Sequence, residues 1–336
     1  MSEVRRDIVT DTWVIVETER DPAPDRGERA VRRPPACPFC AGNEAMTPPE
    51  IAAVRDRGGP DAPGWRVRVV PDRHPVLRIE GRLERVGVGI HDMVTGVGAN
   101  EVVVEAPDHE TSFAALKPGQ VELILRTWRE RLADLYRDQR FRYVIIFKDH
   151  GTMAGGTMIE HVHSQIIALP ATPRRIKDQL AGARNYFEYK ERCIFCDILQ
   201  DELRSRDRVV VEGERFAVFT PYASRLPFEL RVMPKRHRFS YAEAADEELA
   251  ELAHTLPSVM AALDRALDAP PFNLVLHTAP NLLPQKGYWQ TVRDDYHWFI
   301  EIIPRVRRTD GFEWGSGFFI NPVPPERAAA RLREVL

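Results

Sequence analysis

The stretch IEHVHSQIIALP, from Ile159 to Pro170, places His161, His163 and Gln165 at alternate positions at the start of an apolar run. Residues at i, i+2 and i+4 of a β-strand point to one face, and the residues between them point to the other. The stretch therefore predicts a strand with one polar working face and one face turned to the core.

The segments around this strand recur in the second half of the chain in the same order. Each half has a Cys-x-x-Cys pair, strand-like stretches, a helical stretch with apolar spacing near 3.6 and then two further strands. The expected helices cover residues 120–138 and 246–267, with a kink or a break at Pro257. Residues 173–184 are expected to form a solvated connector, and YHWFIEIIPR, residues 296–305, is the counterpart of the opening strand.

This repeat predicts an α+β fold of two tandem homologous lobes, residues 1–188 and 189–336. We expect each lobe to contain a mainly antiparallel sheet with flanking helices, because its strands alternate and its helical stretches are amphipathic.

Composition and charge exclude several classes of protein. The chain has 336 residues, of which 43% are hydrophobic and 29% charged, a profile typical of globular proteins. No apolar run approaches the roughly 20 residues of a membrane helix, and MSEVRRDIVT lacks the apolar core of a signal peptide. A net charge of −3 provides no broad basic field for nucleic acid. We therefore expect a cytoplasmic protein that binds neither nucleic acid nor membrane.

All four cysteines occur in two close pairs, CPFC and CIFC. Secreted disulfide scaffolds are denser in cysteine, and redox pairs open a helix inside a βαβ pattern, whereas the first pair here follows a Pro/Arg-rich loop. Metal binding is therefore favoured over redox chemistry.

Each cysteine pair is followed by a histidine just after a strand and by a histidine that heads a late strand. Two cysteines and two histidines form a complete tetrahedral zinc set with no open position, so two structural zinc ions per chain are expected. The predicted ligands are Cys37, Cys40, His109 and His161 in the first half and Cys193, Cys196, His237 and His297 in the second, with His277 as an alternative to His297.

His163 lies beside the predicted ligand His161 but belongs to neither ligand set. A neutral imidazole is a competent nucleophile toward phosphorus, and covalent capture splits a difficult transfer into two easier steps. Gln165 can donate an amide hydrogen to a phosphoryl oxygen but cannot act as acid or base. Because no third histidine is present there, we expect the intermediate to wait for an acceptor. The matching strand has Phe299 and Glu301 at these positions, so only the first lobe should react.

These motifs resemble the galactose-1-phosphate uridylyltransferase family of the histidine-triad superfamily. The resemblance covers nearly the whole chain and is strongest for members with two zinc sites. It is carried by CPFCAGNEAMTPPE, RVVPDRHPVL, FKDHGTMAGGTMIEHVHSQIIALP, NLVLHTAP and YHWFIEIIPR. It implies two histidine-triad-like lobes and a homodimer.

The activity that the resemblance implies is a ping-pong exchange. His163 would attack the α-phosphorus of a nucleotide sugar, release a sugar 1-phosphate and pass the nucleotide to another sugar 1-phosphate. One alternative is a phosphorylase that uses inorganic phosphate on a nucleotide sugar or a dinucleoside polyphosphate. A second alternative is a non-catalytic, zinc-stabilised protein that binds nucleotides.

The resemblance also implies a set of substrate-binding residues from five segments of the chain. Two of them depart from the family pattern, because carboxylates stand where the family has asparagines, near a site that should hold phosphates. The sequence therefore leaves the base and the sugar open. The predicted set is Arg20, Asp72, Lys148, Asp149, Gly155, Gly156, Thr157 and Asn321.

Overall fold

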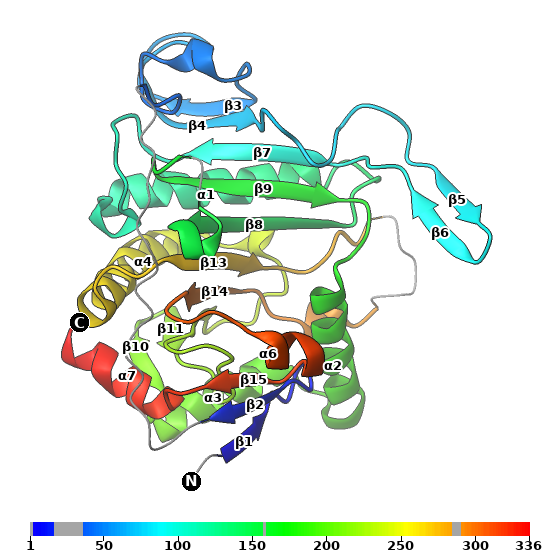
Figure 1. Cartoon of the computed structure of the whole chain (residues 1–336), viewed down its shortest axis with the longest axis vertical. Coiled ribbons are helices and arrows are strands. Elements are labelled where there is room, and N and C mark those ends of the chain that lie inside the picture. The colour runs from blue at the N-terminus through cyan, green and yellow to red at the C-terminus, as the bar shows by residue number, and fades with distance from the viewer. Residues whose placement is uncertain (1–2, 17–35, 157–158, 284–289) are drawn as a thin grey trace.

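The computed structural model describes residues 3–16, 36–156, 159–283 and 290–336. Its centre is a ten-stranded antiparallel sheet in the order β10-β11-β12-β14-β13-β8-β9-β7-β4-β3 (Figure 1). These strands are β3 (Ala52–Arg55), β4 (Trp65–Pro71), β7 (Ala99–Val104), β8 (Tyr143–His150), β9 (His163–Leu169), β10 (Val209–Glu212), β11 (Phe216–Phe219), β12 (Leu230–Pro234), β13 (Phe272–His277) and β14 (Phe299–Pro304). The predicted α+β class with a mainly antiparallel sheet is confirmed.

The order of the strands is mirrored about the centre of the sheet. Five strands come from each half of the chain, and the halves meet where β8 pairs with β13, with Phe147 opposite Val275. The mirror makes β4, β7 and β9 the counterparts of β11, β12 and β14. The division of the chain at residue 188 stays a prediction.

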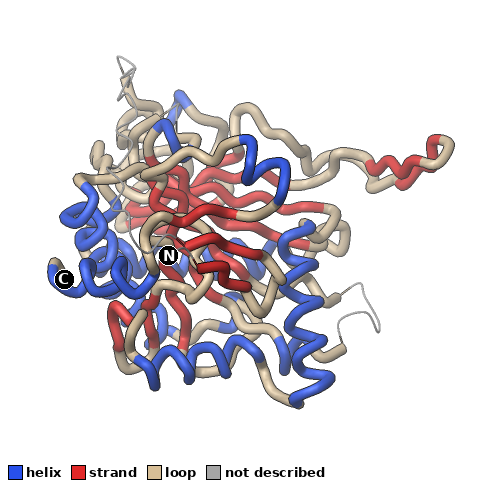
Figure 2. Tube along the Cα trace, turned by 60° about the horizontal axis from the view of Figure 1, so that its bottom comes forward, coloured by secondary structure: helices blue, strands red, loops and turns tan. Residues whose placement is uncertain are grey.

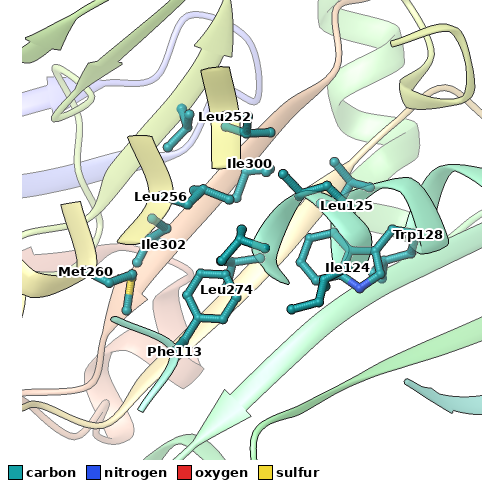
Figure 3. Close-up of a cluster of buried hydrophobic side chains, with 14 of the residues drawn as sticks. Phe113, Ile124, Leu125, Trp128, Leu252, Leu256, Met260, Leu274, Ile300 and Ile302 are labelled. Atoms are coloured by element: carbon teal, nitrogen blue, oxygen red, sulfur yellow. The ribbon is translucent and has the colours of Figure 1, made fainter. Parts of the chain in front are cut away.

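Two helices cover one face of this sheet, α1 (Pro118–Leu135) and α4 (Asp246–Leu267). Figure 3 shows Ile124 and Trp128 of α1 and Leu252 and Leu256 of α4 packed over β13 and β14. α4 continues through Pro257 without a break, and this proline is buried. Burial of so many apolar side chains outweighs the single backbone hydrogen bond that a proline removes.

The opposite face of the sheet, which we call the site face, carries His163. Over the second half of the sheet this face is covered by α2 (Arg174–Lys190) and α3 (Ile194–Ser205). The prediction of a solvated connector at residues 173–184 is therefore wrong, because Ile176 and Leu180 of α2 are buried. Over the first half, alternate residues of β9 remain half-buried from His163 onward.

The two ends of the chain meet beside the second half. β1 (Glu3–Arg6) pairs with β2 (Trp13–Val16), which lies parallel to β15 (Phe319–Asn321). A separate hairpin, β5 (Arg85–Val88) and β6 (His91–Val94), projects from the first half (Figure 2). The remaining helices are α5 (Val292–Asp295), α6 (Gly311–Ser316), α7 (Pro325–Glu334) and the 3₁₀ turns η1 (Glu44–Met46), η2 (Phe113–Ala115), η3 (Thr152–Ala154) and η4 (Tyr241–Glu243). None of the helices in the described ranges is long and apolar enough to cross a membrane.

Candidate functional site

His163 is the first residue of β9, and its ring is fixed by the backbone just before it. Its Nδ1 atom lies 2.7 Å from the carbonyl oxygen of His161. A carbonyl oxygen can only accept a hydrogen bond, so Nδ1 carries the hydrogen and Nε2 keeps its lone pair. The ring of Phe39, from the first Cys-x-x-Cys pair, lies at 5.4 Å from that of His163. The sequence thus places one imidazole in a single tautomer on the site face.

The protonation state of His163 suits a nucleophile. Burial lowers the pKa of His163 to about 4, and the hydrogen bond to the His161 carbonyl oxygen opposes this shift only in part. The imidazole is therefore neutral near pH 7, which is the form that can attack an electrophile.

The main chain of His163 is held from the other side of the sheet by a buried ion pair. Lys148 Nζ donates to the His163 carbonyl oxygen at 2.8 Å and pairs with the carboxylate of Glu105. In the register of β8 with β9, Phe147 lies opposite Gln165, so Lys148 points to the core face. The structure therefore places Lys148 beneath the strand of His163 rather than on the site face.

The first predicted ligand set comes together in space. The ligand atoms of all four residues lie within 4.8 Å of one another. His161 Nε2 donates to the carbonyl oxygen of Ala106 at 2.8 Å, which leaves Nδ1 facing Cys37 Sγ at 3.5 Å and Cys40 Sγ at 3.7 Å. His109 Nδ1 lies 3.5 Å from Cys40 Sγ. A backbone acceptor on the far nitrogen orients a histidine for metal binding, so this cluster can hold a metal ion.

The second predicted set forms an equivalent cluster. Its ligand atoms also lie within 4.8 Å of one another, with Cys196 Sγ 3.3 Å from His237 Nδ1 and 3.5 Å from His297 Nδ1. His277 lies outside this cluster. Its Nδ1 accepts from the amide of Gln179 at 3.3 Å, so its Nε2 carries the hydrogen and faces a carboxylate.

The counterpart of His163 in the second half has no reactive group. Phe299 stacks on His277 with 4.5 Å between ring centroids, and both rings are buried. Glu301, at the position of Gln165, is buried and paired with Arg175 and Arg225. The second half therefore has a cluster that could hold a metal ion and an unreactive side chain at the position of His163.

Comparison with known proteins agrees with this geometry. Sequence models of the N-terminal and C-terminal domains of galactose-1-phosphate uridyl transferase match residues 88–173 and 179–305. The chain is 32% identical over 340 residues to the ADP-glucose phosphorylase of Arabidopsis thaliana, with 99% of this chain and 93% of that protein covered. It is 29% identical over 347 residues to the galactose-1-phosphate uridylyltransferase of Thermotoga maritima, with 99% and 98% covered.

Solved structures agree as well. The structure of the Arabidopsis thaliana ADP-glucose phosphorylase with bound ADP-glucose superposes with a TM-score of 0.83 at 30% identity, covering 100% of this chain and 99% of that one. A uridylyltransferase structure superposes with a TM-score of 0.74 at 28% identity, covering 100% and 98%. The chain belongs to the galactose-1-phosphate uridylyltransferase family. The predicted family and the predicted nucleotidyltransferase class are confirmed.

The glycine-rich turn that the family resemblance singles out lies between β8 and β9. Gly155 adopts φ +95°, and a Cβ on Gly156 would come within 2.7 Å of the Asp149 carbonyl oxygen. Asp149 Oδ1 accepts from the amide of Asn273 on β13 at 2.6 Å. The turn is therefore fixed against the second half of the sheet, and the binding of substrate by these residues stays a prediction.

The other predicted substrate residues of this uridylyltransferase-family chain are scattered. Asp72 follows β4 and accepts from the backbone N–H of His74 at 2.8 Å. Asn321 is fully buried, and its amide donates to the Ser224 carbonyl oxygen at 2.9 Å, so the structure holds it inside the protein. Arg20 and Thr157 lie outside the described residues.

Two further residues support the site and were not predicted. Phe39 contacts the rings of both His161 and His163, and Glu105 fixes Lys148 from a fully buried position. The sequence offered one signal for each residue. Phe39 lies inside a Cys-x-x-Cys pair, and Glu105 is a lone acid at the end of the apolar run EVVVEAP.

Proposed function

We propose that this chain transfers a nucleoside monophosphate from a nucleotide sugar to the phosphate of a sugar 1-phosphate, through a covalent intermediate on His163. The observation that supports this most is the hydrogen bond that fixes Nδ1 of His163 and leaves Nε2 with its lone pair. A bystander histidine does not need one tautomer, whereas a nucleophile does.

In the first step, the Nε2 lone pair would bond to the α-phosphorus, and the bond from that phosphorus to the bridging oxygen would break. The sugar 1-phosphate would leave with the electron pair. In the second step, a phosphate oxygen of the acceptor would attack the same phosphorus, and the imidazole would leave neutral. Gln165 would donate a hydrogen bond from its amide to a non-bridging oxygen in both steps.

We propose zinc as the ion of both clusters. With Zn–S near 2.3 Å and Zn–N near 2.05 Å, a tetrahedral site separates sulfur and nitrogen by about 3.6 Å. Five sulfur–nitrogen distances in the two clusters lie between 3.3 and 3.7 Å. Each ion would be closed off by its four protein ligands, so it would stabilise the fold and orient His161 beside His163.

The second candidate function uses inorganic phosphate as the acceptor. It is favoured by the 32% identity to the ADP-glucose phosphorylase of Arabidopsis thaliana. The chemistry at His163 would be the same, and only the molecule that takes the nucleotide from the imidazole would differ.

Product analysis tests both candidates. Metal-loaded protein is incubated with nucleotide sugars labelled in the α-phosphate, together with either a hexose 1-phosphate or inorganic phosphate. Exchange of label into a new nucleotide sugar supports transfer between sugars, and release of a labelled nucleoside diphosphate supports the phosphorylase. Neither product, from any nucleotide sugar of a panel that varies the base and the sugar, would contradict the proposed function.

A further inference from the structure

A cavity of about 740 Å³ lies in the second half of the molecule, away from His163. Its walls come from residues 6–8, from α3, from the end of β11 with the loop 221–223, and from Arg231 of β12. No described residue of strands β3 to β9 lines it. Its volume is within the roughly 300–1,000 Å³ of small-molecule sites.

The cavity lies where the internal repeat places the counterpart of Asp72, one of the predicted substrate-binding residues. β11 and β12 correspond to β4 and β7 in the mirrored sheet. Pro221 and Tyr222 follow β11 as Asp72 follows β4, and Asp72 is predicted to bind the substrate, which the proposed function takes to be a nucleotide sugar. This correspondence, which rests on the proposed function, points to a nucleotide as the class of ligand.

Arg231 is a buried cation in the wall of this cavity. Its side chain is only 8% exposed, and its guanidinium lies 4.5 Å from the ring centroid of Phe299, the residue at the position of His163. The Nε atom of Arg231 has no hydrogen-bond partner. In the described part of the chain, the guanidinium of Arg231 forms no ion pair with any residue. A buried charge without a partner is costly, and an anion from solution would relieve that cost.

The carboxylate nearest to Arg231 in the sheet is already used. Glu301 lies opposite Arg231 in the register of β12 with β14. Its two oxygens bind Arg175 at 2.7 Å and Arg225 at 2.9 Å, and His277 lies at 3.3 Å. The positive charge of Arg231 is therefore not neutralised by its strand neighbour.

Two acidic residues in the walls of the cavity are paired with other arginines, and the carboxylate of a third, Asp7, accepts from the backbone N–H groups of Val9 and Thr10. Asp197 binds Arg192 at 2.8 Å, and Glu202 binds Arg208 at 3.0 Å. The charged walls thus leave Arg231 as the group that can receive a phosphate. Apolar and aromatic side chains of the wall that keep exposed surface and could contact a base are Ile8, Tyr186, Ile198 and Tyr222.

We propose that this cavity is a second, non-catalytic nucleotide site, in which Arg231 binds the phosphate of a nucleoside monophosphate. Arginine matches the geometry of phosphate oxygens with two parallel hydrogen bonds. Phe299 beneath it cannot form a bond to phosphorus, so the nucleotide would bind reversibly.

Equilibrium dialysis of the full-length, metal-loaded protein with labelled AMP, UMP and GMP tests this proposal. A nucleoside monophosphate has no sugar phosphate leaving group, so it cannot react with His163 and the dialysis measures binding alone. We expect two equivalents of the preferred nucleotide per chain at saturation. Arg231→Met should weaken one of them at least about ten-fold, because it removes the charge-assisted hydrogen bonds.

Arg204→Met is the matched control, because Arg204 lies on the rim of the cavity and is 79% exposed. It should weaken binding less than about two-fold, as expected for a screened surface charge. Arg231→Lys keeps the positive charge but lacks the planar guanidinium, so it should weaken nucleotide binding to an intermediate extent. This variant replaces Arg231→Met in the test if Arg231→Met fails to fold.

Wild-type binding, of one or of two equivalents per chain, that neither Arg231 variant weakens would overturn the second site. Displacement by inorganic phosphate as effective as by the nucleotide would overturn its assignment to nucleotides. The outcomes are independent of the first site: absence of covalent label on His163 refutes the proposed function, whereas this dialysis reads Arg231 alone.

Discussion

At the scale of the residue, the proposed function depends on which nitrogen atom of a histidine has no partner in the protein. His161 and His163 are two positions apart, yet His161 directs Nδ1 to the cysteines and His163 uses Nδ1 to bond a carbonyl oxygen. The same side chain is therefore placed to bind a metal ion in one case and offers a free Nε2 in the other.

Replacing Gln165 by histidine tests the role of the amide. A third imidazole could activate water or protonate a leaving group, so hydrolysis of the nucleotide sugar should rise relative to transfer, by at least about ten-fold. Gln165→Asn, which adds no base, is the control and should not raise hydrolysis. Unchanged hydrolysis by the histidine variant, with His163 still labelled, would show that the role given to Gln165 is wrong.

His277 should make stability depend on pH. Burial lowers the pKa of His277 to about 4; Glu301 raises it, and the charges of Arg175 and Arg231 lower it further. Because an unfolded histidine has a pKa near 6.5, the unfolded state binds more protons between these values, and stability falls as the pH falls. The free energy of unfolding should drop by about 2 kcal/mol from pH 7 to pH 5 through this residue.

Urea unfolding of His277→Gln at both pH values checks this prediction. The variant should lose less stability on acidification than the wild type, and His254→Gln, at an exposed position of α4, should behave like the wild type. An equal loss in all three proteins would contradict it.

The roles of residues were predictable from the sequence where their spacing recurs in both halves of the chain, and less predictable elsewhere. Both clusters of cysteine and histidine contain the predicted residues, because two parallel sets of four constrain each other. Lys148 shows the limit of prediction from the sequence. Its motif predicted that it binds substrate, whereas its register in β8 directs the side chain to the core face, where it pairs with Glu105. Glu105 and Phe39 gain their roles only through contacts that are distant in sequence.

At the scale of the element, the amphipathic pattern of the sequence predicted the helices and strands that bury one face and expose the other. The expected bounds of the helix at 246–267 coincide with those of α4. α2 was missed because PRRIKDQLAGAR has many basic residues, and its buried stripe of Ile176, Leu180 and Ala183 packs on a half of the sheet that is far along the chain. Pro257 was tolerated because α4 packs along the core.

Two glycines in helices should respond oppositely to the same substitution. A Cβ at Gly182 of α2 would come within 1.8 Å of the carbonyl oxygen of Val9, whereas a Cβ at Gly119 of α1 would meet nothing within 4 Å. Gly182→Ala should lower the free energy of unfolding by about 1–3 kcal/mol, the usual cost of overpacking. Gly119→Ala should raise it by about 0.5–1 kcal/mol, because alanine restricts the unfolded chain.

Denaturant unfolding of the two variants and the wild type measures both changes. A Gly182→Ala protein as stable as Gly119→Ala would mean that α2 is not docked against the N-terminal segment as described.

At the scale of the whole molecule, the two halves are joined by backbone pairing. β8 and β13 turn two five-stranded units into one sheet, and the N-terminal strands pack beside β15 of the second half. The repeat in the sequence predicted two similar units, but pairing between their edge strands depends on contacts that no local pattern encodes. The homodimer and the cytoplasmic location stay predictions.

Removal of the metal ions should therefore lower the stability of the whole molecule. Elemental analysis should find about two zinc ions per chain, and Cys40→Ser and Cys196→Ser should each lose about one. Both variants and chelated wild type should melt at lower temperature than the metal-loaded protein, because metal binding is coupled to folding. Wild type without bound metal and with an unchanged melting temperature would contradict the structural role of both clusters.

The most direct test of the proposed function is covalent labelling of His163. Metal-loaded wild type is mixed with nucleotide sugars carrying a radioactive α-phosphate, quenched, and mapped to the peptide that contains residues 159–170. An acid-labile label should appear on His163, persist in the exposed-histidine control His254→Ala and vanish in His163→Ala. Label that remains in His163→Ala, or no label in the wild type with any nucleotide sugar of the panel, would contradict the account.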